Sequence, residues 1–278
     1  QVQGVLQQLG VCVNNTDRAS LLPLATAHPF VAELIKYRDA AKAVAMCEKL
    51  RGAWDPATGR VYPNYVQLGA ATGRMSCREP NLQQVPRDPL FRHCFIAPEG
   101  RRLIIADYSQ IELRIVAELS GDDRMLTAFR AGEDLHRLTA ALIKGKALGD
   151  VTPEERSAAK AVNFGLIYGM SAQGLRTSAR LDYGVELTLE EAQAFVDRFF
   201  QAYPGVARWQ EAQRRKAWTK RVRTLGQRRR LWPDRPNDRE LLNTPVQGTG
   251  ADILKEALAR LAVRLQGSDA LLVAAVHD

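Results

Sequence analysis

Two short apolar runs, each ending on an aspartate, constrain the fold of this chain more than any other feature. Residues 101–107 read RRLIIAD, and residues 270–278 read ALLVAAVHD. Short runs rich in β-branched and other apolar residues that stop at a polar turn residue are typical of buried strands. The two runs lie far apart in the sequence. Only a fold that brings distant segments into one sheet can therefore place the two carboxylates side by side.

Aspartates at strand ends can lie half exposed at the rim of a sheet. On neighbouring strands, Asp107 and Asp278 would make a hard oxygen site for magnesium. Paired metals about 3.5–4 Å apart can activate an attacking hydroxyl and stabilise a leaving oxygen in phosphoryl transfer. Strands also end on aspartate simply because the chain turns there. The position of either residue alone leaves both interpretations open.

A second pattern lies in residues 156–170, which read RSAAKAVNFGLIYGM. Two cations and then two aromatic rings recur at steps of four: Arg156, Lys160, Phe164 and Tyr168. Steps of four drift by about 40° each on a helix, so the four side chains form one stripe. The cations suit the phosphates of a nucleoside triphosphate, and the rings suit its sugar and base. A solvated basic turn leading into a buried aromatic turn has the same spacing and stays an alternative.

The rest of the chain predicts a mixed α/β organisation. A capping threonine, an early proline and two acids, at residues 152–155, predict a helix over 152–171. The other predicted elements are helices over 21–52, 123–146 (one or two), 188–219 with a break at 203–205, and 245–266, and short strands near Val61 and Tyr65. We find no internal repeat and no low-complexity linker.

Composition narrows the class of protein. Lys and Arg outnumber Asp and Glu by 39 to 31, a net charge of +8 that suits a polyanion such as nucleic acid. The four cysteines, Cys12, Cys47, Cys77 and Cys94, show neither CxxC pairs nor zinc-site spacing, so we expect reduced thiols. No apolar run approaches the ~20 residues that span a bilayer, and we expect no membrane partner.

The two patterns also resemble a known family. DYSQIELR at 107–114 is similar to motif A of the family A DNA polymerases, and AVHD at 275–278 resembles the start of their motif C. The stripe matches their motif B, RxxxKxxxFxxxYG. The resemblance covers roughly residues 30–278 and implies the right-hand polymerase fold, of mixed α/β (α+β) class, with a palm sheet, helical fingers and a partial thumb.

The resemblance divides the chain along this fold. It implies a partial thumb at residues 1–52, a first part of the palm with motif A at 53–120, fingers at 121–238 with the motif B helix at 153–171, and a second part of the palm with the start of motif C at 239–278.

The resemblance implies a metal site and a catalytic lysine. Asp107 and Asp278 would bind two Mg²⁺ ions, for which Mn²⁺ can substitute, and Tyr108 would add its backbone carbonyl. Lys160 would donate a proton to the leaving pyrophosphate. The family continues motif C beyond its aspartate with Glu and a second strand, whereas this sequence stops at Asp278.

The resemblance also implies a pocket for a deoxynucleoside triphosphate. Its residues would be Arg156, Lys160, Phe164, Tyr168, Glu112, Gln110 and His136. Glu112 would lie against the 2′ side of the sugar and exclude a ribose hydroxyl. Phe164 lacks the hydroxyl that accompanies acceptance of dideoxynucleotides in relatives, and His136 would lie near the phosphates.

Two polar segments resemble the parts of the family that contact primer-template DNA. They are TGRMSCREPNLQQVP at 72–86 and RELLNTPVQGTGADI at 239–253. The implied DNA contacts are Arg74, Asn81, Gln83, Arg239, Asn243, Gln247 and, at the primer terminus, His277. Gln173 stands where relatives often carry an aromatic residue, so template contacts there differ from the family pattern.

The sequence therefore predicts a DNA-directed DNA polymerase, a nucleotidyltransferase that adds deoxynucleotides to a primer 3′-OH in replication or repair. We expect a monomer in the cytoplasm, either the bacterial cytosol or a phage-infected cell. One alternative is a non-catalytic DNA-binding remnant, since the sequence stops at motif C. Another is a single-subunit RNA polymerase of the phage type, against which Glu112 and Phe164 argue.

Overall fold

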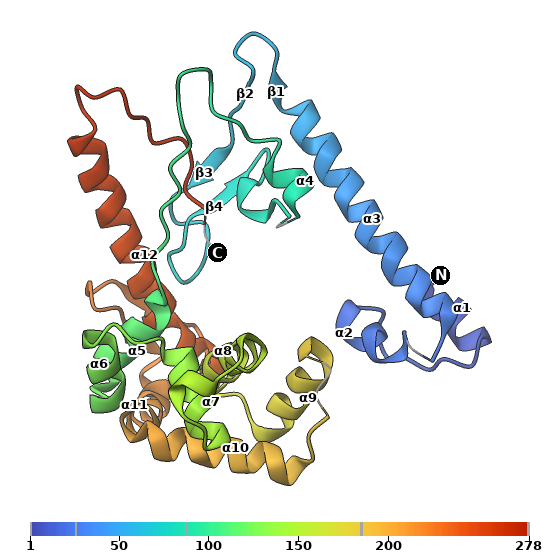
Figure 1. Cartoon of the computed structure of the whole chain (residues 1–278), viewed down its shortest axis with the longest axis vertical. Coiled ribbons are helices and arrows are strands. Elements are labelled where there is room, and N and C mark those ends of the chain that lie inside the picture. Colours follow the sequence, from blue (N-terminus) through green and yellow to red (C-terminus); the bar gives the residue numbers. More distant parts are fainter. Residues whose placement is uncertain (1, 26, 87, 184–185, 277–278) are drawn as a thin grey trace. The chain divides into compact units, whose positions relative to one another are not determined.

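The structure of the chain is a computed structural model that describes residues 2–25, 27–86, 88–183 and 186–276. These residues form two compact units (Figure 1). The first unit holds residues 2–65 and 77–103, and the second holds residues 66–76 and 104–276.

The first unit is built on one long helix, α3 (Pro29–Gly52), shown in blue in Figure 1. Proline at the first position already has the helical φ angle and lacks an N–H that would have no partner there. Lys49 and Arg51, in the last turn, lie at the negative end of the helix dipole. The short elements before it are α1 (Val2–Gln8), α2 (Arg18–Leu21) and η1 (Leu22–Leu24). The helix predicted from residue 21 therefore begins at residue 29.

A small apolar core holds the N-terminal end of α3. Its buried members are Leu6, Val11, Leu21, Val31 and Ile35. Beyond α3, the first unit continues with η2 (Leu82–Gln84) and α4 (Pro89–Arg92).

The described residues contain three small two-stranded sheets. Their strands are β1 (Trp54–Asp55) with β2 (Arg60–Val61), β3 (Asn64–Val66) with β4 (Ser76–Arg78), and β5 (Arg221–Arg223) with β6 (Arg229–Leu231). The first and third pairs are antiparallel, with Trp54 opposite Val61 and Val222 opposite Arg230. The short strands predicted near Val61 and Tyr65 are confirmed as β2 and β3.

The second unit is mainly helical. Its helices are α5 (Ile111–Ser120), α6 (Asp123–Arg130), α7 (Leu135–Lys144), η3 (Leu148–Asp150), α8 (Pro153–Ile167), α9 (Ala172–Tyr183), α10 (Leu189–Ala202), α11 (Pro204–Arg215), η4 (Lys216–Thr219) and α12 (Asp238–Arg264). Helix α7 packs against α8 and α10, and α5 packs against α11 and α12 (Figure 1). One large core joins them and includes Leu113, Met125, Leu166, Tyr203 and Leu242.

Asp122 joins two of these helices through a buried carboxylate. It caps α6 by accepting from Met125 N at 3.1 Å, and its other oxygen accepts from Gly205 N at 2.8 Å. A Cβ on Gly205 would lie 2.7 Å from the Asp122 Cα atom, so only glycine allows this close approach of α11. Two backbone donors thus satisfy the buried charge.

Most helices predicted from the sequence are confirmed. The 123–146 segment forms α6 and α7, and the break at 203–205 separates α10 from α11. Helix α12 starts earlier than residue 245, because Asn237 caps it by accepting from Glu240 N at 2.9 Å. Pro245 lies inside this helix rather than at its start.

The two apolar runs that end on aspartates do not form strands in the described residues. Residues 101–107 and 270–276 have no strand pairing. Their side chains are exposed: Ile104 by 91%, Ile105 by 89%, Leu271 by 65% and Val273 by 57%. The prediction that these two runs form buried strands is therefore wrong for the part of the chain that the structure describes. A strand needs a neighbouring segment that pairs with it residue by residue, and no described segment forms such a ladder with either run.

Within the described ranges, no helix is both long enough and apolar enough to cross a bilayer. The four cysteines are free thiols, and only Cys77 among them is buried. Its sulfur accepts from Leu82 N at 3.3 Å and donates to Pro80 O at 3.4 Å, so it has a local structural role.

Candidate active site

Helix α8 carries the cationic and aromatic stripe. A capping box fixes its start: Thr152 Oγ1 accepts from Glu155 N at 3.2 Å, and the Glu155 carboxylate accepts from Thr152 N at 3.1 Å. This start confirms the one predicted from the sequence, and each bond satisfies a backbone N–H at the helix end. Arg156, Lys160 and Phe164 all lie within the helix.

Arg156 is held by the first residue before α7. Its Nε donates to Asp134 Oδ2 at 2.7 Å. The other Asp134 oxygen caps α7 by accepting from His136 N at 2.9 Å and Arg137 N at 3.2 Å. Burial by itself raises the pKa of Asp134. The hydrogen bonds from the Arg156 side chain and the Arg137 backbone outweigh this effect, and the pKa lies below its usual value. Asp134 thus ties the start of α7 to the cationic part of the stripe.

His136 is buried against the same face of α8. The side chain of this residue is only 3% exposed, its ring centroid lies 5.8 Å from that of Phe164, and Asn163 Nδ2 lies 3.0 Å from its Nδ1. Burial lowers the pKa of His136 to about 4; Asp134 opposes this shift, and Arg156 adds to it. The imidazole is therefore neutral at pH 7. Because an amide nitrogen only donates, Nδ1 accepts from Asn163, and the ring proton is on Nε2.

Three predicted site residues meet at the carboxylate of Glu112, in the first turn of α5. The Arg74 guanidinium Nη2 donates to Oε1, and the Tyr168 hydroxyl donates to Oε2. Arg74 comes from the loop between β3 and β4, and Tyr168 follows the last residue of α8. The sequence patterns did not predict this direct contact. We call Arg74, Glu112 and Tyr168 the Glu112 cluster.

Gln110 lies directly before α5 in a strained backbone conformation. Its φ of 54° and ψ of 38° are left-handed, which costs a non-glycine residue of order 1–3 kcal/mol. Its side-chain oxygen is buried without a hydrogen-bond partner in the described part of the chain. Strain and an unpaired buried acceptor together are typical of a residue that a ligand engages.

Asp107 and Tyr108 are exposed and lie in the irregular segment before α5. The Asp107 carboxylate has neither an ion pair nor a hydrogen bond within the described residues. Its oxygens are thus hard ligands of the type that fits Mg²⁺. No three His, Cys, Asp or Glu side chains of the described residues gather into a metal site. The second predicted ligand, Asp278, and His277 lie outside the described residues.

An arginine outside the sequence predictions holds the loop that carries Arg74. Arg228, between β5 and β6, donates from Nε to Asp252 Oδ1 at 2.7 Å and from Nη2 to Thr72 O at 2.6 Å. Lys255 Nζ donates to Gly73 O at 2.7 Å. Burial, followed by the nearby charge of Arg228, lowers the pKa of Lys255. Two cations from separate elements therefore fix the backbone that immediately precedes Arg74.

The predicted DNA contacts of the C-terminal part share one helix. Arg239, Asn243 and Gln247 all lie on α12, as their four-residue spacing predicts. Arg239 is exposed, and the other two are half-buried. The Asn243 side-chain oxygen is buried without a hydrogen-bond partner among the described residues, so it remains available to a donor.

The remaining DNA-contact predictions lie in the first unit. Asn81 caps η2 by accepting from Gln83 N at 3.0 Å, which is a local structural role. Asn81 and Gln83 belong to the first unit, and the Glu112 cluster belongs to the second.

Sequence reasoning missed three residues that support the site: Asp134, Asn163 and Arg228. Asp134 was recognisable, since an aspartate directly before a helical run is a common N-cap. Asn163 lies on α8 beside Phe164, but nothing in its spacing marks it as the partner of His136. Arg228 lies in an arginine-rich segment in which the sequence singles out no member.

Residues 7–278 match the family model described as DNA polymerase family A. The chain belongs to this family. Within family A, it is 48% identical over 226 residues to DNA polymerase I of Aquifex aeolicus, covering 79% of this chain and 38% of that protein. It is 41% identical over 282 residues to the thermostable DNA polymerase I of Thermus thermophilus, covering 95% and 33%. The chain thus spans only 33–38% of the length of these relatives.

A solved family A structure agrees with this assignment. It is described as the POL domain of Pol1 from M. smegmatis in complex with DNA primer-template and dNTP. The two match with a TM-score of 0.80 and 35% identity, over 91% of this chain and 46% of that chain. The predicted family and the mixed α/β fold class are therefore confirmed.

Proposed function

We propose that this chain provides the polymerase site of a template-directed DNA polymerase that extends a primer 3′-OH with deoxynucleotides. The observation that carries the proposal is the Glu112 cluster. Its three members come from motif A, from the end of the motif B helix and from the polar loop before β4, and the resemblance assigns all three to nucleotide or primer. A surface assembled from these three motifs suits a nascent base pair.

The triphosphate would bind at the cationic end of the stripe. Arg156 and Lys160 supply two positive charges to the phosphates. The neutral His136 adds an Nε2–H donor, because Asn163 holds its other nitrogen. Asp134 keeps Arg156 beside His136, so the donors are oriented before the nucleotide arrives.

Glu112 and Phe164 would select deoxyribose. The Glu112 carboxylate is oriented by Arg74 and Tyr168 from two sides, which leaves it little freedom to move away from an additional hydroxyl. A ribose 2′-OH would clash with a carboxylate that cannot move aside, so the site favours a sugar without this hydroxyl. Phe164 lies beside His136 and supplies an apolar surface for the sugar.

Asp107 is the metal-binding carboxylate of this proposal, together with Asp278 beyond the described residues. When bound there, two divalent cations activate the attacking hydroxyl and stabilise the leaving oxygen. The primer 3′-OH gives its proton to solvent and its oxygen forms a bond to the α-phosphorus, while the bond from that phosphorus to the bridging oxygen breaks. Lys160 gives its proton to the departing pyrophosphate.

Arg74 has two candidate partners in this scheme. Its guanidinium is paired with Glu112, whereas the resemblance assigns it to the primer. The two roles are compatible, because one guanidinium carries five N–H donors and the Nε of Arg74 is buried without a partner among the described residues. Primer binding would therefore use donors that the Glu112 pair leaves unused.

Replacement of Asp107 tests the proposal. Asp107→Ala should lower primer extension by about a thousandfold or more, since metal stabilisation contributes several kcal/mol to the transition state. DNA affinity, followed by fluorescence anisotropy of a labelled primer-template, should change little. Glu118→Ala, at an exposed acid on α5, is the matched control and should leave extension intact.

Other outcomes favour the alternatives. Extension that survives Asp107→Ala contradicts the metal role. Binding of DNA by the unmodified protein without extension, with Mg²⁺ or Mn²⁺, favours a non-catalytic remnant. Preference for ribonucleotides over deoxynucleotides favours an RNA polymerase and contradicts the role of Glu112.

A further inference from the structure

A cavity lies behind α8, on the face that does not carry the stripe. Its volume is about 260 Å³, and α7, α8, α9 and α10 surround it. The lining residues that come from α8 are Glu154, Glu155, Ala158, Ala159, Ala161 and Val162. None of the stripe residues lines it, so the cavity is distinct from the proposed triphosphate site.

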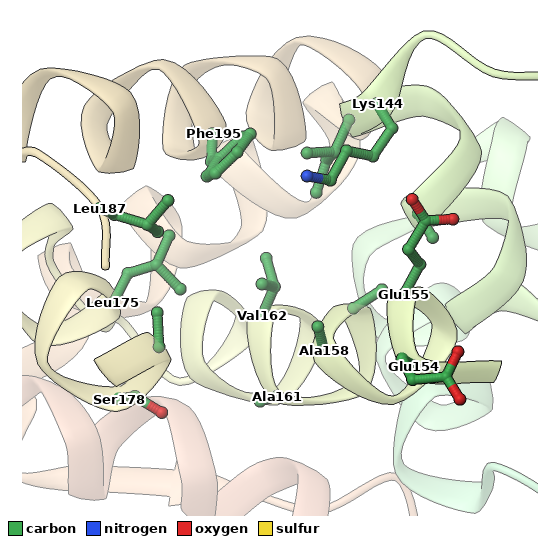
Figure 2. A pocket seen from close by; sticks show the side chains of 14 residues that line it. Lys144, Glu154, Glu155, Ala158, Ala161, Val162, Leu175, Ser178, Leu187 and Phe195 are labelled. Atoms are coloured by element: carbon green, nitrogen blue, oxygen red, sulfur yellow. The ribbon is translucent and has the colours of Figure 1, made fainter. Parts of the chain in front are cut away.

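The interior of the cavity is apolar. Figure 2 shows Val162, Leu175 and Phe195 turned toward its centre from three different helices. An apolar cavity of roughly 150 Å³ is large enough to bind benzene. A cavity of about 260 Å³ with one aromatic wall therefore has room for two fused rings. The α8 residues that line the cavity include three alanines, whose small side chains leave room for a ligand.

One end of the cavity is lined by charged residues, and Lys144 is the cation among them. The ammonium nitrogen of Lys144 points into the cavity in Figure 2 and lies 5.9 Å from the Phe195 ring centroid. Lys144 has no carboxylate partner among the described residues. The Glu155 carboxylate beside it is already engaged, since it accepts from Lys146 Nζ at 2.6 Å and from Thr152 N. Glu154 is exposed, and in Figure 2 its oxygens point away from the cavity.

We propose that this cavity binds a small planar aromatic carboxylate, with its rings against Phe195 and Val162 and its acid group at Lys144. The Lys144 ammonium has no carboxylate partner among the described residues and therefore favours an anionic ligand over a cationic one. The ligand occupies the face of α8 opposite Arg156 and Lys160. The site is therefore separate from nucleotide binding in space and in chemistry.

The test compares two isosteric probes, 1-naphthoate and 1-naphthylmethylammonium, titrated into the intact protein at pH 7 by calorimetry. Naphthoate should bind with a Kd on the order of 0.1 mM, as expected for a ligand of this size, and about tenfold more tightly than the amine. Lys144→Met should reduce this preference to within about twofold. Lys42→Met, at an exposed lysine of α3, is the matched control and should leave both affinities unchanged.

Two further variants locate the probe. Ala158→Phe fills the cavity from its floor and should abolish naphthoate binding, provided that thermal unfolding shows an intact fold. Ala179→Leu narrows the cavity from α9, and its naphthoate affinity decides the question if Ala158→Phe does not fold. Loss of binding in either folded variant supports the assignment.

Several results would overturn the proposal. They are the absence of naphthoate binding, tighter binding of the amine, unchanged binding in the folded cavity-filling variants, and displacement of naphthoate by dATP. The last result would place the probe on Arg156 and Lys160, on the other face of α8, rather than in the cavity.

Discussion

Helices α7 and α8 differ from the two exposed apolar runs in the origin of their backbone hydrogen-bond partners. In α7 and α8, each backbone N–H finds its carbonyl four residues earlier, and side chains such as Asp134 and Thr152 complete the ends. Residues 101–107 and 270–276 are also rich in apolar residues, yet they remain largely exposed and without strand pairing in the described chain. Apolar composition alone does not create a strand.

This difference shows which parts of a functional site can form from local sequence alone. A helix is complete once its own residues adopt it, and packing then orients its faces. A strand is complete only when another segment lies beside it in register. The cationic and aromatic stripe of α8 therefore forms in the structure, whereas the strands predicted to hold Asp107 and Asp278 need a neighbouring strand, and no described segment pairs with residues 101–107 or 270–276.

The largest expected effect is the pH dependence of stability, which tests the packing of His136 between α7 and α8. The folded pKa of His136 is about 4, below its unfolded value of about 6.5. Between these values the unfolded chain binds a proton that the folded chain does not, so stability falls as pH falls from 6.5 to 4. The loss should be on the order of 3 kcal/mol. Urea unfolding at a series of pH values measures it.

The His136→Gln variant is the control for this prediction. It should lose most of the pH dependence between 6.5 and 4, while changes below pH 4 persist because Asp134 also titrates there with a lowered pKa. If the variant and the unmodified protein have the same pH profile, His136 is accessible to water in the folded protein. The buried packing of α7 on α8 would then be contradicted.

A smaller effect is expected from Asn163→Ala. This side chain is fully buried and donates to His136, so its removal leaves a buried acceptor unpaired and should cost about 2 kcal/mol of unfolding free energy. The matched variant Ser157→Ala, at an exposed position on the same helix, should stay within about 0.5 kcal/mol. Denaturant midpoints of the two variants make the comparison, and equal midpoints would contradict the buried pairing.

The smallest effect is expected in the two exposed apolar runs. Ile105→Thr should change stability by less than about 0.5 kcal/mol, because its side chain is already in water. A loss of about 2 kcal/mol or more would mean that residues 101–107 are buried in solution, as the sequence pattern predicts and the structure does not show. Denaturant unfolding with Val273→Thr in parallel extends the test to the second run.

How much of this molecule could be predicted from its sequence follows the same division. The start of α8 and the break before α11 were predictable, because Thr152, Pro204 and their neighbours act within one turn of chain. The start of α12 was predicted at residue 245, whereas the helix begins at Asp238 after the cap at Asn237.

The candidate site was predictable as a set of residues but not as a set of contacts. Motif spacing and family resemblance selected Arg74, Glu112 and Tyr168 separately, and nothing in the spacing indicated that one carboxylate would join them. The support from Arg228 to the backbone of Thr72 is a contact between distant segments. Such contacts follow from tertiary packing, which a local pattern does not encode.

Binding of Mn²⁺, followed by electron paramagnetic resonance, shows whether Asp107 and Asp278 hold the same metal ions, as we propose. We predict that Asp107→Ala and Asp278→Ala each remove high-affinity Mn²⁺ binding, and that the double variant is no worse than either single one, because the two carboxylates share one site. Mn²⁺ affinity that survives both single substitutions, or losses that add as for independent sites, would contradict the account.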